Sequence, residues 1–266
     1  KNKARPFFLY LPHTFPHLPL FASKDFHGKS ANGRYGDSVE EIDWSTGQIL
    51  DCLDRLKLSK DTIVIFTSDN GSNGRHGGSN APLSGAKGST MEGGMRVPMI
   101  ARWPGRIPSG STCEELSTTM DFLPTFAAIS GAKLSGAKID GFDIAPLLLG
   151  KENATSPYEA FYYYRRRQLQ AIRWGDWKWH LPLEKTHPNW TTPKATGRGR
   201  PARLYNLAKD IREKNNVLKD NPEVMKKMRK LAEEAVSSIG NDATGGSEAR
   251  PALTLDTSAP LVLKKK

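Results

Sequence analysis

The sequence has few cysteines and no long apolar run, and both shortages exclude classes of protein. Cys52 and Cys113 are the 2 cysteines among 266 residues, which is too few for a disulfide framework or a zinc-finger array. The longest apolar runs lie at residues 6–12 and 62–66, whereas a membrane-spanning helix takes about 20 apolar residues. We therefore expect no membrane span. We also expect no nucleic-acid partner, because no zinc-finger spacing, RNP-like motif or helix-turn-helix pattern is present.

Aromatic and basic residues, by contrast, are plentiful. The chain carries 10 Phe, 7 Tyr and 6 Trp, and 37% of its residues are hydrophobic, which is enough apolar material for a packed core. Lys and Arg number 39 against 28 Asp and Glu, for a net charge of +11. This balance favours anionic ligands. The sharpest basic run, Arg165–Arg167, is a candidate substrate contact, although charge runs usually lie on solvated faces.

A strand–helix–strand pattern occupies the first part of the chain. The continuous apolar run Phe7–Leu11 is typical of a strand covered on both faces in a parallel sheet. Apolar residues at helical spacing over Asp37–Leu58 predict an amphipathic helix, and Ile63–Phe66 is the most strand-like segment. This order predicts a βαβ unit with two parallel strands. A further strand is predicted within Val97–Trp103 and a helix over Met120–Gly131.

Beyond Gly150 the pattern changes to short strands followed by one helix. Strands are predicted at Phe161–Tyr164, Gln170–Arg173, Trp177–His180 and Leu204–Leu207, and an amphipathic helix at Pro222–Ser238. We therefore expect an α/β protein with a mostly parallel sheet flanked by helices, and a small C-terminal antiparallel sheet plus helix. The expected divisions are 1–150 for the α/β part, 151–238 for the small α+β subdomain and 239–266 for a flexible tail.

Polar residues follow both predicted parallel strands. His13 and His17 come after the first strand, and Asp69 and Asn70 come after the second. Ligands of open α/β sheets bind outside the carboxyl ends of the strands, so both clusters should open on one edge. Carboxylate and amide oxygens suit a hard cation such as Ca²⁺ or Mg²⁺, but two oxygens do not complete a site. The Asn-Gly pair is also a common turn signal, which leaves a simple turn as the alternative.

Two further side chains could serve an anionic substrate. His17 lies between prolines that restrict its backbone, and histidine can donate to an anion or act as a general acid; an ordinary loop histidine is the alternative. Lys87 lies among small residues that leave its ammonium open to an oxyanion, although most lysines are simply solvated. His76 is a weaker candidate in the same long loop.

Taken in order, these segments resemble the sulfatase family, the arylsulfatase branch of the alkaline-phosphatase superfamily. The match extends over residues 5–235, and the set in this order is far more specific than any single motif. The matching motifs are Pro6–Tyr10 with His17–Pro19, Thr67–Gly71, Gly85–Thr90 with Glu92–Gly94 and Arg96–Pro98, Asp121–Thr125, Asp140–Asp143, Ala171–Lys178 and Leu204–Leu207.

The resemblance assigns roles to four residues of this sequence. It implies that Asp69 and Asn70 are metal ligands, usually for Ca²⁺, with Mg²⁺ as the alternative. It implies that His17 and Lys87 are both catalytic and substrate-binding, because they match residues that hold the sulfate and stabilise charge on the departing oxygen. The implied activity is that of a sulfuric ester hydrolase acting on an anionic sulfate ester, for example a sulfated glycan.

The nucleophile of that family is absent from this sequence. The resemblance implies a formylglycine made from Cys or Ser within a C/S-x-P/A-x-R motif, and neither Cys52 nor Cys113 fits that motif. We therefore expect this chain to be the C-terminal portion of a sulfatase, inactive without an N-terminal segment of the same protein. The resemblance also implies a periplasmic, extracellular or lysosomal location, although no signal segment is visible.

Two alternatives remain open. A phosphodiesterase or phosphonate-ester hydrolase of the same superfamily would share the Asp69-Asn70 motif. A non-catalytic polyanion-binding module would use Arg165–Arg167 and the C-terminal lysines Lys264–Lys266 instead.

Overall fold

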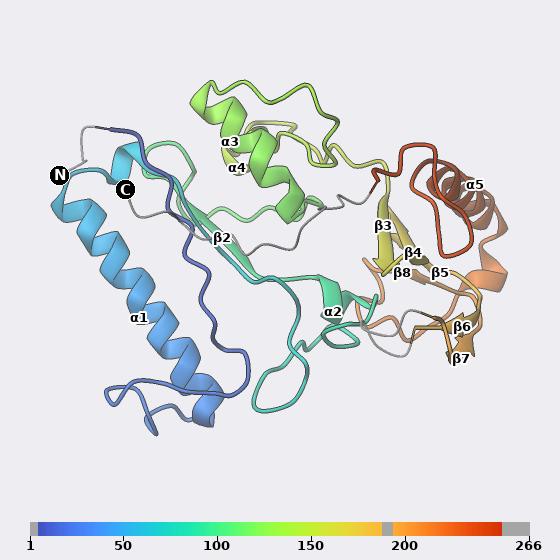
Figure 1. Ribbon diagram of the computed structural model, residues 1–266, viewed down its shortest axis with the longest axis horizontal. Coiled ribbons are helices and arrows are strands. Elements are labelled where there is room, and N and C mark those ends of the chain that lie inside the picture. The colour runs from blue at the N-terminus through green and yellow to red at the C-terminus, as the bar shows by residue number, and fades with distance from the viewer. Residues whose placement is uncertain (1–4, 188–193, 252–266) are drawn as a thin grey trace, which may run out of the picture.

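The computed structural model describes residues 5–187 and 194–251. Figure 1 shows two groups of elements, with helix α1 and the strand pair β1–β2 on one side and a four-stranded sheet with helix α5 on the other. The short helix α2 lies between the two groups (Figure 1). None of the described helices combines the length and apolar character that a membrane crossing requires.

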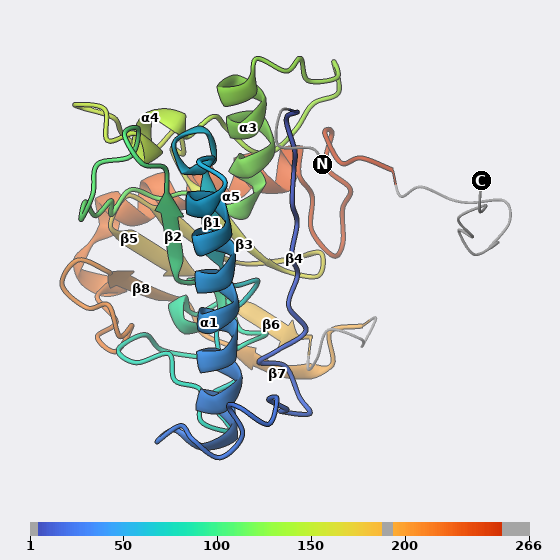
Figure 2. The ribbon, with the colours of Figure 1, turned by 90° about the vertical axis from the view of Figure 1, so that its left-hand side faces the viewer.

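The first group contains one long helix, one pair of strands and several short helices. Strand β1 pairs antiparallel with β2, with Val64 opposite Arg102. Figure 2 shows α1 running lengthwise along one side of the molecule. Gly131, in the left-handed conformation, ends α3 at the glycine that the sequence predicts. The elements are α1 (Gly33–Arg55), η1 (Ser59–Asp61), β1 (Val64–Thr67), α2 (Glu92–Met95), β2 (Met99–Arg102), η2 (Thr119–Asp121), α3 (Phe122–Ser130) and α4 (Ala145–Leu148).

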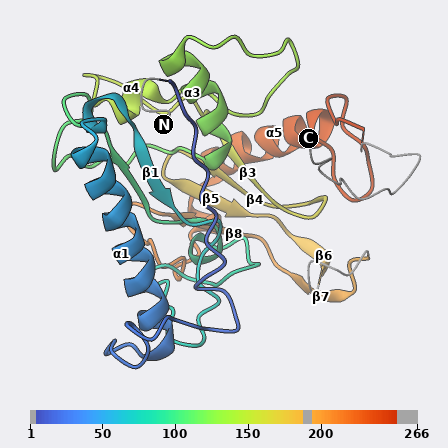
Figure 3. The same cartoon turned by 60° about the vertical axis from the view of Figure 1, so that its left-hand side comes forward.

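The second group is an antiparallel sheet with the strand order β3-β4-β5-β8, covered by α5. A separate hairpin, β6–β7, extends from one end of this sheet (Figure 3). That hairpin is absent from the sequence prediction because its short strands are charged and glycine-containing rather than apolar. The elements are β3 (Phe161–Arg165), β4 (Gln168–Trp174), β5 (Trp177–His180), β6 (Leu183–Thr186), β7 (Gly197–Arg200), β8 (Arg203–Asn206), η3 (Leu218–Asp220) and α5 (Pro222–Ser238).

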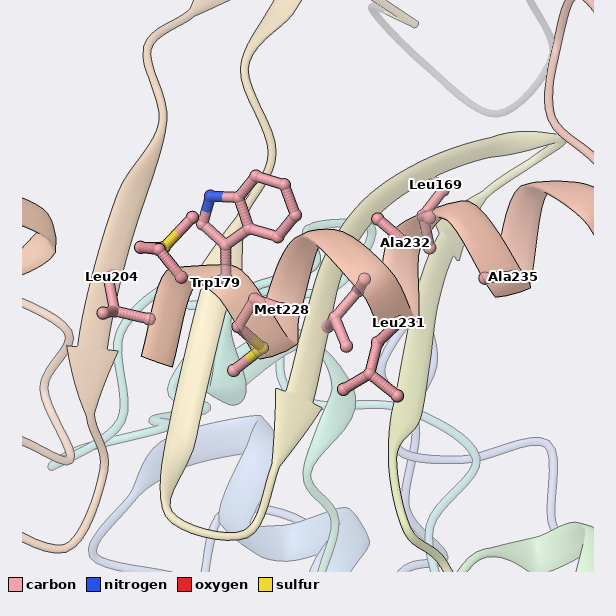
Figure 4. Packing of buried hydrophobic residues seen from close by; sticks show 9 residues of the cluster. Leu169, Trp179, Leu204, Met228, Leu231, Ala232 and Ala235 are labelled. Atoms are coloured by element: carbon pink, nitrogen blue, oxygen red, sulfur yellow. The ribbon is translucent and has the colours of Figure 1, made fainter. Parts of the chain in front are cut away.

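The main hydrophobic core lies between α5 and this sheet. Met228 and Leu231 of α5 are buried against Trp179 of β5 and Leu204 of β8, and Figure 4 shows these side chains where the helix crosses the strands. The buried positions of α5 recur at intervals of three and four residues, which places them on one face of the helix. Burying one such side chain contributes about 1.5–3 kcal/mol, so this contact is a major stabilising element of the C-terminal part.

The structure corrects one part of the predicted fold. The α/β class and the small C-terminal antiparallel sheet plus helix are confirmed, but Phe7–Leu11 forms no strand, and its side chains are 48% to 79% exposed. Phe8 contacts Phe126 of α3, with ring centroids 6.2 Å apart. All strand pairs among the described residues are antiparallel, so the predicted parallel pairing with Ile63–Phe66 is not found there. The apolar run therefore predicted both burial and a neighbouring strand, and among the described residues this segment has neither.

The predicted tail lies partly within the described residues. Gly240 bridges to Gly245, and the guanidinium of Arg250 contacts both the carbonyl of Lys138 and the carboxylate of Asp140. The rest of the predicted tail, residues 252–266, lies outside the described residues.

Candidate active site

Asp69 and Asn70 lie in the turn that follows β1, as the sequence predicts. The hydroxyl of Thr67 donates to the carbonyl of Pro98 at 3.0 Å, and the Gly71 N–H donates to the carbonyl of Gly94 at 3.2 Å. These bonds hold the turn against α2. Gly71 is required there, because a Cβ at this position would lie 1.9 Å from the carbonyl oxygen of Gly93.

Lys87 lies in the loop between β1 and α2, which returns to the turn that contains Asp69 and Asn70. Its backbone N–H donates to the carbonyl of Ser72 at 2.9 Å, and Ser72 is two residues beyond Asn70. The Asn80 side chain holds the loop together, because it accepts from the Ser72 N–H at 2.8 Å and donates to the carbonyls of Ser72 at 2.8 Å and Gly85 at 3.1 Å. The Lys87 side chain is exposed. The structure therefore brings the Lys87 backbone beside the segment that carries the predicted metal ligands.

His17 is held by its own loop. Its Nδ1 lies 2.9 Å from the carbonyl oxygen of Leu18, and its backbone N–H donates to the carbonyl of Thr14. A carbonyl oxygen only accepts, so Nδ1 carries the proton, and the neutral ring then leaves Nε2 as an acceptor. Within the described residues, no hydrogen bond or ion pair joins His17 to Asp69 or Lys87. The place of His17 in the site therefore stays a prediction, and so do those of His13 and His76.

A buried ionic network lies beneath the Lys87 loop. Lys178 of β5 is fully buried, and its Nζ lies 2.7 Å from Glu92 Oε1 and 3.2 Å from Glu213 Oε1. Tyr163 Oη donates to the same Glu92 oxygen at 3.0 Å, and the Lys178 ammonium lies 4.2 Å from the centre of the Tyr163 ring. Each buried charge thus has opposite charge or hydrogen-bond donors around it, which such burial requires.

Glu213 joins this network to the backbone of α2. One of its oxygens accepts the Glu92 N–H at 2.8 Å, and the other lies 2.7 Å from Nε2 of His180. Burial lowers the pKa of His180 and outweighs the attraction of Glu213. The pKa of Glu213 is also lowered: burial acts to raise it, but the hydrogen bond from His180 and the charge of Lys178 together prevail. The carboxylate of Glu213 therefore stays ionised in the interior.

Sequence reasoning did not assign functions to these buried charges. Glu92 and Lys178 lie within the family motifs, but the resemblance implies no role for either. One signal was available, because Lys178 stands between two tryptophans in a short predicted strand. If the side chain of a lysine in such an apolar strand is buried, it needs an acidic partner, because lysine is almost never fully buried without one.

A second connection ties the same loop to the sheet and its hairpin. The Thr90 hydroxyl donates to Oε1 of Gln170 in β4 at 3.2 Å, and Arg200 of β7 donates to the same oxygen at 2.8 Å. Ser84, earlier in the loop, donates to the carbonyl of Arg212. The loop that carries Lys87 is therefore held from the C-terminal sheet at several points along its length.

The donor chemistry of Asp69 and Asn70 fits a hard cation incompletely. Their oxygens suit Ca²⁺ or Mg²⁺ better than soft metals, but Ca²⁺ takes 6–8 oxygen ligands. Over residues 5–187 and 194–251, no group of three or more His, Cys, Asp and Glu residues could hold a metal ion. These two residues would thus form one part of a coordination shell.

Comparisons with known proteins agree with the motifs. The family profile described as Sulfatase matches residues 1–132, and the profile for the C-terminal region of aryl-sulfatase matches residues 156–254. A third, for the C-terminal part of N-sulphoglucosamine sulphohydrolase, matches residues 87–179. Among curated relatives, steryl-sulfatase of Homo sapiens is 47% identical over 183 residues, covering 65% of this chain and 31% of that protein. Arylsulfatase A of Homo sapiens is 37% identical over 250 residues, covering 87% of this chain and 49% of that protein.

Solved structures resemble the chain as well. A Bacteroides thetaiotaomicron structure described with the metabolism of multiple glycosaminoglycans aligns with a TM-score of 0.76 at 33% identity, over 88% of this chain and 51% of that one. The crystal structure of Ps i-CgsB in complex with k-i-k-neocarrahexaose aligns with a TM-score of 0.73 at 30% identity, over 93% of this chain and 53% of that one.

The fold thus places the chain among the α/β proteins that resemble alkaline phosphatase. Within that class, the chain belongs to the sulfatase family. It spans 31% and 49% of the length of the two curated relatives named above.

Proposed function

We propose that this chain acts within a sulfatase that hydrolyses sulfate monoesters to an alcohol and inorganic sulfate. The observation that carries the proposal is the hydrogen bond from the Lys87 N–H to the carbonyl of Ser72, beside the turn that contains Asp69 and Asn70. The backbone of an exposed lysine thus lies next to the segment that carries the two proposed oxygen ligands, which is an arrangement suited to an anionic ester. The sulfatase relatives of the chain support the same reaction.

In this proposal Lys87 and His17 act on the sulfate group and the departing oxygen. The Lys87 ammonium binds the sulfate oxygens and stabilises the negative charge that grows as the S–O bond breaks. His17 holds its Nδ1 proton on the Leu18 carbonyl, so it presents Nε2 to the substrate and donates from that atom when the ring is protonated. Asp69 and Asn70 would hold Ca²⁺, with Mg²⁺ as the alternative, and a bound cation would neutralise charge on the sulfate. A formylglycine nucleophile is proposed outside this chain.

The further proposals on organisation follow from the same resemblance. We propose a division into residues 1–150, 151–238 and 239–266. The change of family profile between residues 132 and 156 supports the first boundary. We propose that an N-terminal segment of the same protein completes the site, and that the protein is periplasmic, extracellular or lysosomal. A sulfated glycan is the proposed substrate class, supported by the relative solved with k-i-k-neocarrahexaose.

The test compares two ester substrates in the polypeptide that joins this chain to its N-terminal segment. We expect faster hydrolysis of an aryl sulfate than of the matching aryl phosphate. Lys87→Ala should lower kcat by about 10²–10³-fold, as loss of a charge-stabilising donor does. The matched control Lys226→Ala removes an exposed lysine of α5 and should leave kcat unchanged.

Two outcomes would count against the proposal. Faster phosphate hydrolysis would favour the phosphodiesterase alternative. We expect negligible turnover from this chain alone, so sulfate release by the isolated chain would disprove the placement of the nucleophile outside it.

A further inference from the structure

An open hollow lies beside the Lys87 loop, where that loop meets the segment after β8. Its volume is about 420 Å³, and it is lined by residues 78–85, Gly74, Arg212 and Lys214. A volume of about 300–1,000 Å³ is usual for small-molecule sites. The lining is mixed, with the polar side chains of Ser79, Asn80 and Ser84 beside the apolar Ala81, Pro82 and Leu83. A ligand that presents both hydroxyl groups and C–H surfaces suits this composition.

The charge of the hollow has one sign. Arg212 and Lys214 are exposed, and neither forms an ion pair with any residue that the structure describes. No Asp or Glu is among the lining residues. An arginine guanidinium and a lysine ammonium close together form a recognition pair for sulfate or carboxylate groups, since the guanidinium binds two oxygens in a fixed geometry.

Glu213, between Arg212 and Lys214 in the sequence, has its side chain in the interior. Glu213 has a φ of 51°, in the left-handed region, and its carboxylate points into the interior toward Lys178 and His180. A non-glycine residue in that conformation is strained, and the contacts of Glu213 with Lys178 and His180 hold it there. With Glu213 turned inward, the two neighbouring side chains lie outside, at the rim of the hollow.

The hollow is lined by the loop that carries Lys87. The Ser84 hydroxyl donates to the carbonyl of Arg212, so the loop and the cationic segment are joined at the hollow itself. Lys87 is three residues beyond Ser84 in the same loop, and Asn80 braces that loop from within. A ligand in the hollow would therefore contact the same loop that carries Lys87.

We propose that the hollow is a second anion-binding subsite, in which Arg212 and Lys214 hold a further sulfate or carboxylate of a polyanionic saccharide. The subsite selects substrates that carry several charges over those with a single sulfate. Its connection to turnover rests on the sulfatase function proposed above, whereas its binding chemistry does not.

The test measures binding directly, without turnover. The probes are a disulfated disaccharide and its unsulfated counterpart, titrated into this chain by calorimetry. Arg212→Gln with Lys214→Gln should weaken binding of the disulfated probe at least tenfold and reduce its salt dependence, while the unsulfated probe binds weakly to both proteins. The control pair Lys219→Gln with Lys226→Gln removes the same charge from exposed positions and should change affinity less than twofold. An unchanged thermal transition shows that both double variants are folded.

The outcomes separate this inference from the proposed function. Equal affinity of the Arg212 and Lys214 double variant and the parent chain would overturn the subsite. Equal binding of a single-stranded oligonucleotide of matched charge would also overturn it, because a saccharide site must discriminate. If Lys87→Ala abolishes sulfate release but retains disaccharide binding, both proposals stand. If the joined polypeptide releases no sulfate while the double variant still loses disaccharide binding, the subsite stands and the sulfatase function fails.

Discussion

Lys178 and Glu92 form a buried ion pair, with 2.7 Å between Nζ and Oε1, although they are 86 residues apart in the sequence. Lys178 lies in β5 and Glu92 begins α2, so the pair connects the C-terminal sheet to the helix that follows the Lys87 loop. The same ammonium meets Glu213 at 3.2 Å. One buried cation thus holds together three segments that support the proposed site.

Removal of that cation should strongly destabilise the chain. Lys178→Met keeps much of the side-chain volume but leaves Glu92 with only Arg173 as a cationic partner, at 3.9 Å, and Glu213 with His180. Breaking a buried pair in this way costs about 3–5 kcal/mol. The free energy of unfolding, measured by urea denaturation, should fall by that amount. Lys226→Met, at an exposed position of α5, should change it by less than about 0.5 kcal/mol. The double variant Lys178→Met with Glu92→Gln should be more stable than Lys178→Met alone, because it also removes a buried negative charge. A double variant no more stable than Lys178→Met would argue against the pairing.

The buried histidine should make stability depend on pH. His180 has its pKa lowered by burial, so it stays neutral in the folded chain while the unfolded chain takes up a proton below the ordinary value of 6.5. The unfolded state then binds more protons, and the free energy of unfolding should decrease as the pH falls below about 6.5. The lowered pKa of Glu213 acts in the same direction at lower pH.

His180→Gln isolates this contribution, since glutamine can donate to Glu213 but does not titrate. Urea denaturation between pH 7 and pH 5 should give a shallower decrease for the variant than for the parent chain. Identical slopes would mean that His180 titrates normally in the folded state.

Replacing two glycines with alanine should change the stability of the chain in opposite directions. Gly71→Ala places a Cβ against the Gly93 carbonyl, and such overpacking costs about 1–3 kcal/mol. Gly47→Ala lies in α1 with no atom within 4 Å of the new Cβ, so it should stabilise the chain by about 0.5–1 kcal/mol through helix propensity. Thermal denaturation of both variants tests the close approach that holds the Asp69 turn. A neutral Gly71→Ala would contradict that approach.

The core under α5 provides a further test. Met228 is fully buried between the helix and the sheet, and Met228→Ala should lower the free energy of unfolding by about 2–5 kcal/mol. Val224, on the same helix, is only partly buried at the edge of the cluster. Val224→Ala should cost clearly less, and a similar loss at both positions would contradict this packing.

The sequence offers candidates for the site because their signals are local. Asp69, Asn70 and Lys87 stand in short motifs, and the long loop between residues 71 and 94 is itself a sign of function. The hydrogen bonds that bring this loop together, from Lys87 to Ser72 and from Gly71 to Gly94, depend on residues far apart in the chain. No periodicity in the sequence records such bonds. The role of His17 stays a prediction because, among the described residues, no hydrogen bond or ion pair joins it to Asp69 or Lys87.

The sequence by itself determined the elements whose hydrophobic spacing matches their own geometry. Helix α5 over Pro222–Ser238 and strand β5 over Trp177–His180 begin and end where the pattern predicts, because each presents one apolar face to the same core. Only the tertiary structure decided that β1 pairs antiparallel with β2, that Phe7–Leu11 remains outside any described sheet, and that Lys178 meets Glu92. The spacing of apolar residues along the chain indicates which face of an element is buried. Which strands pair, and which charges meet, depends instead on the distant segment that supplies the hydrogen-bond and charge partners.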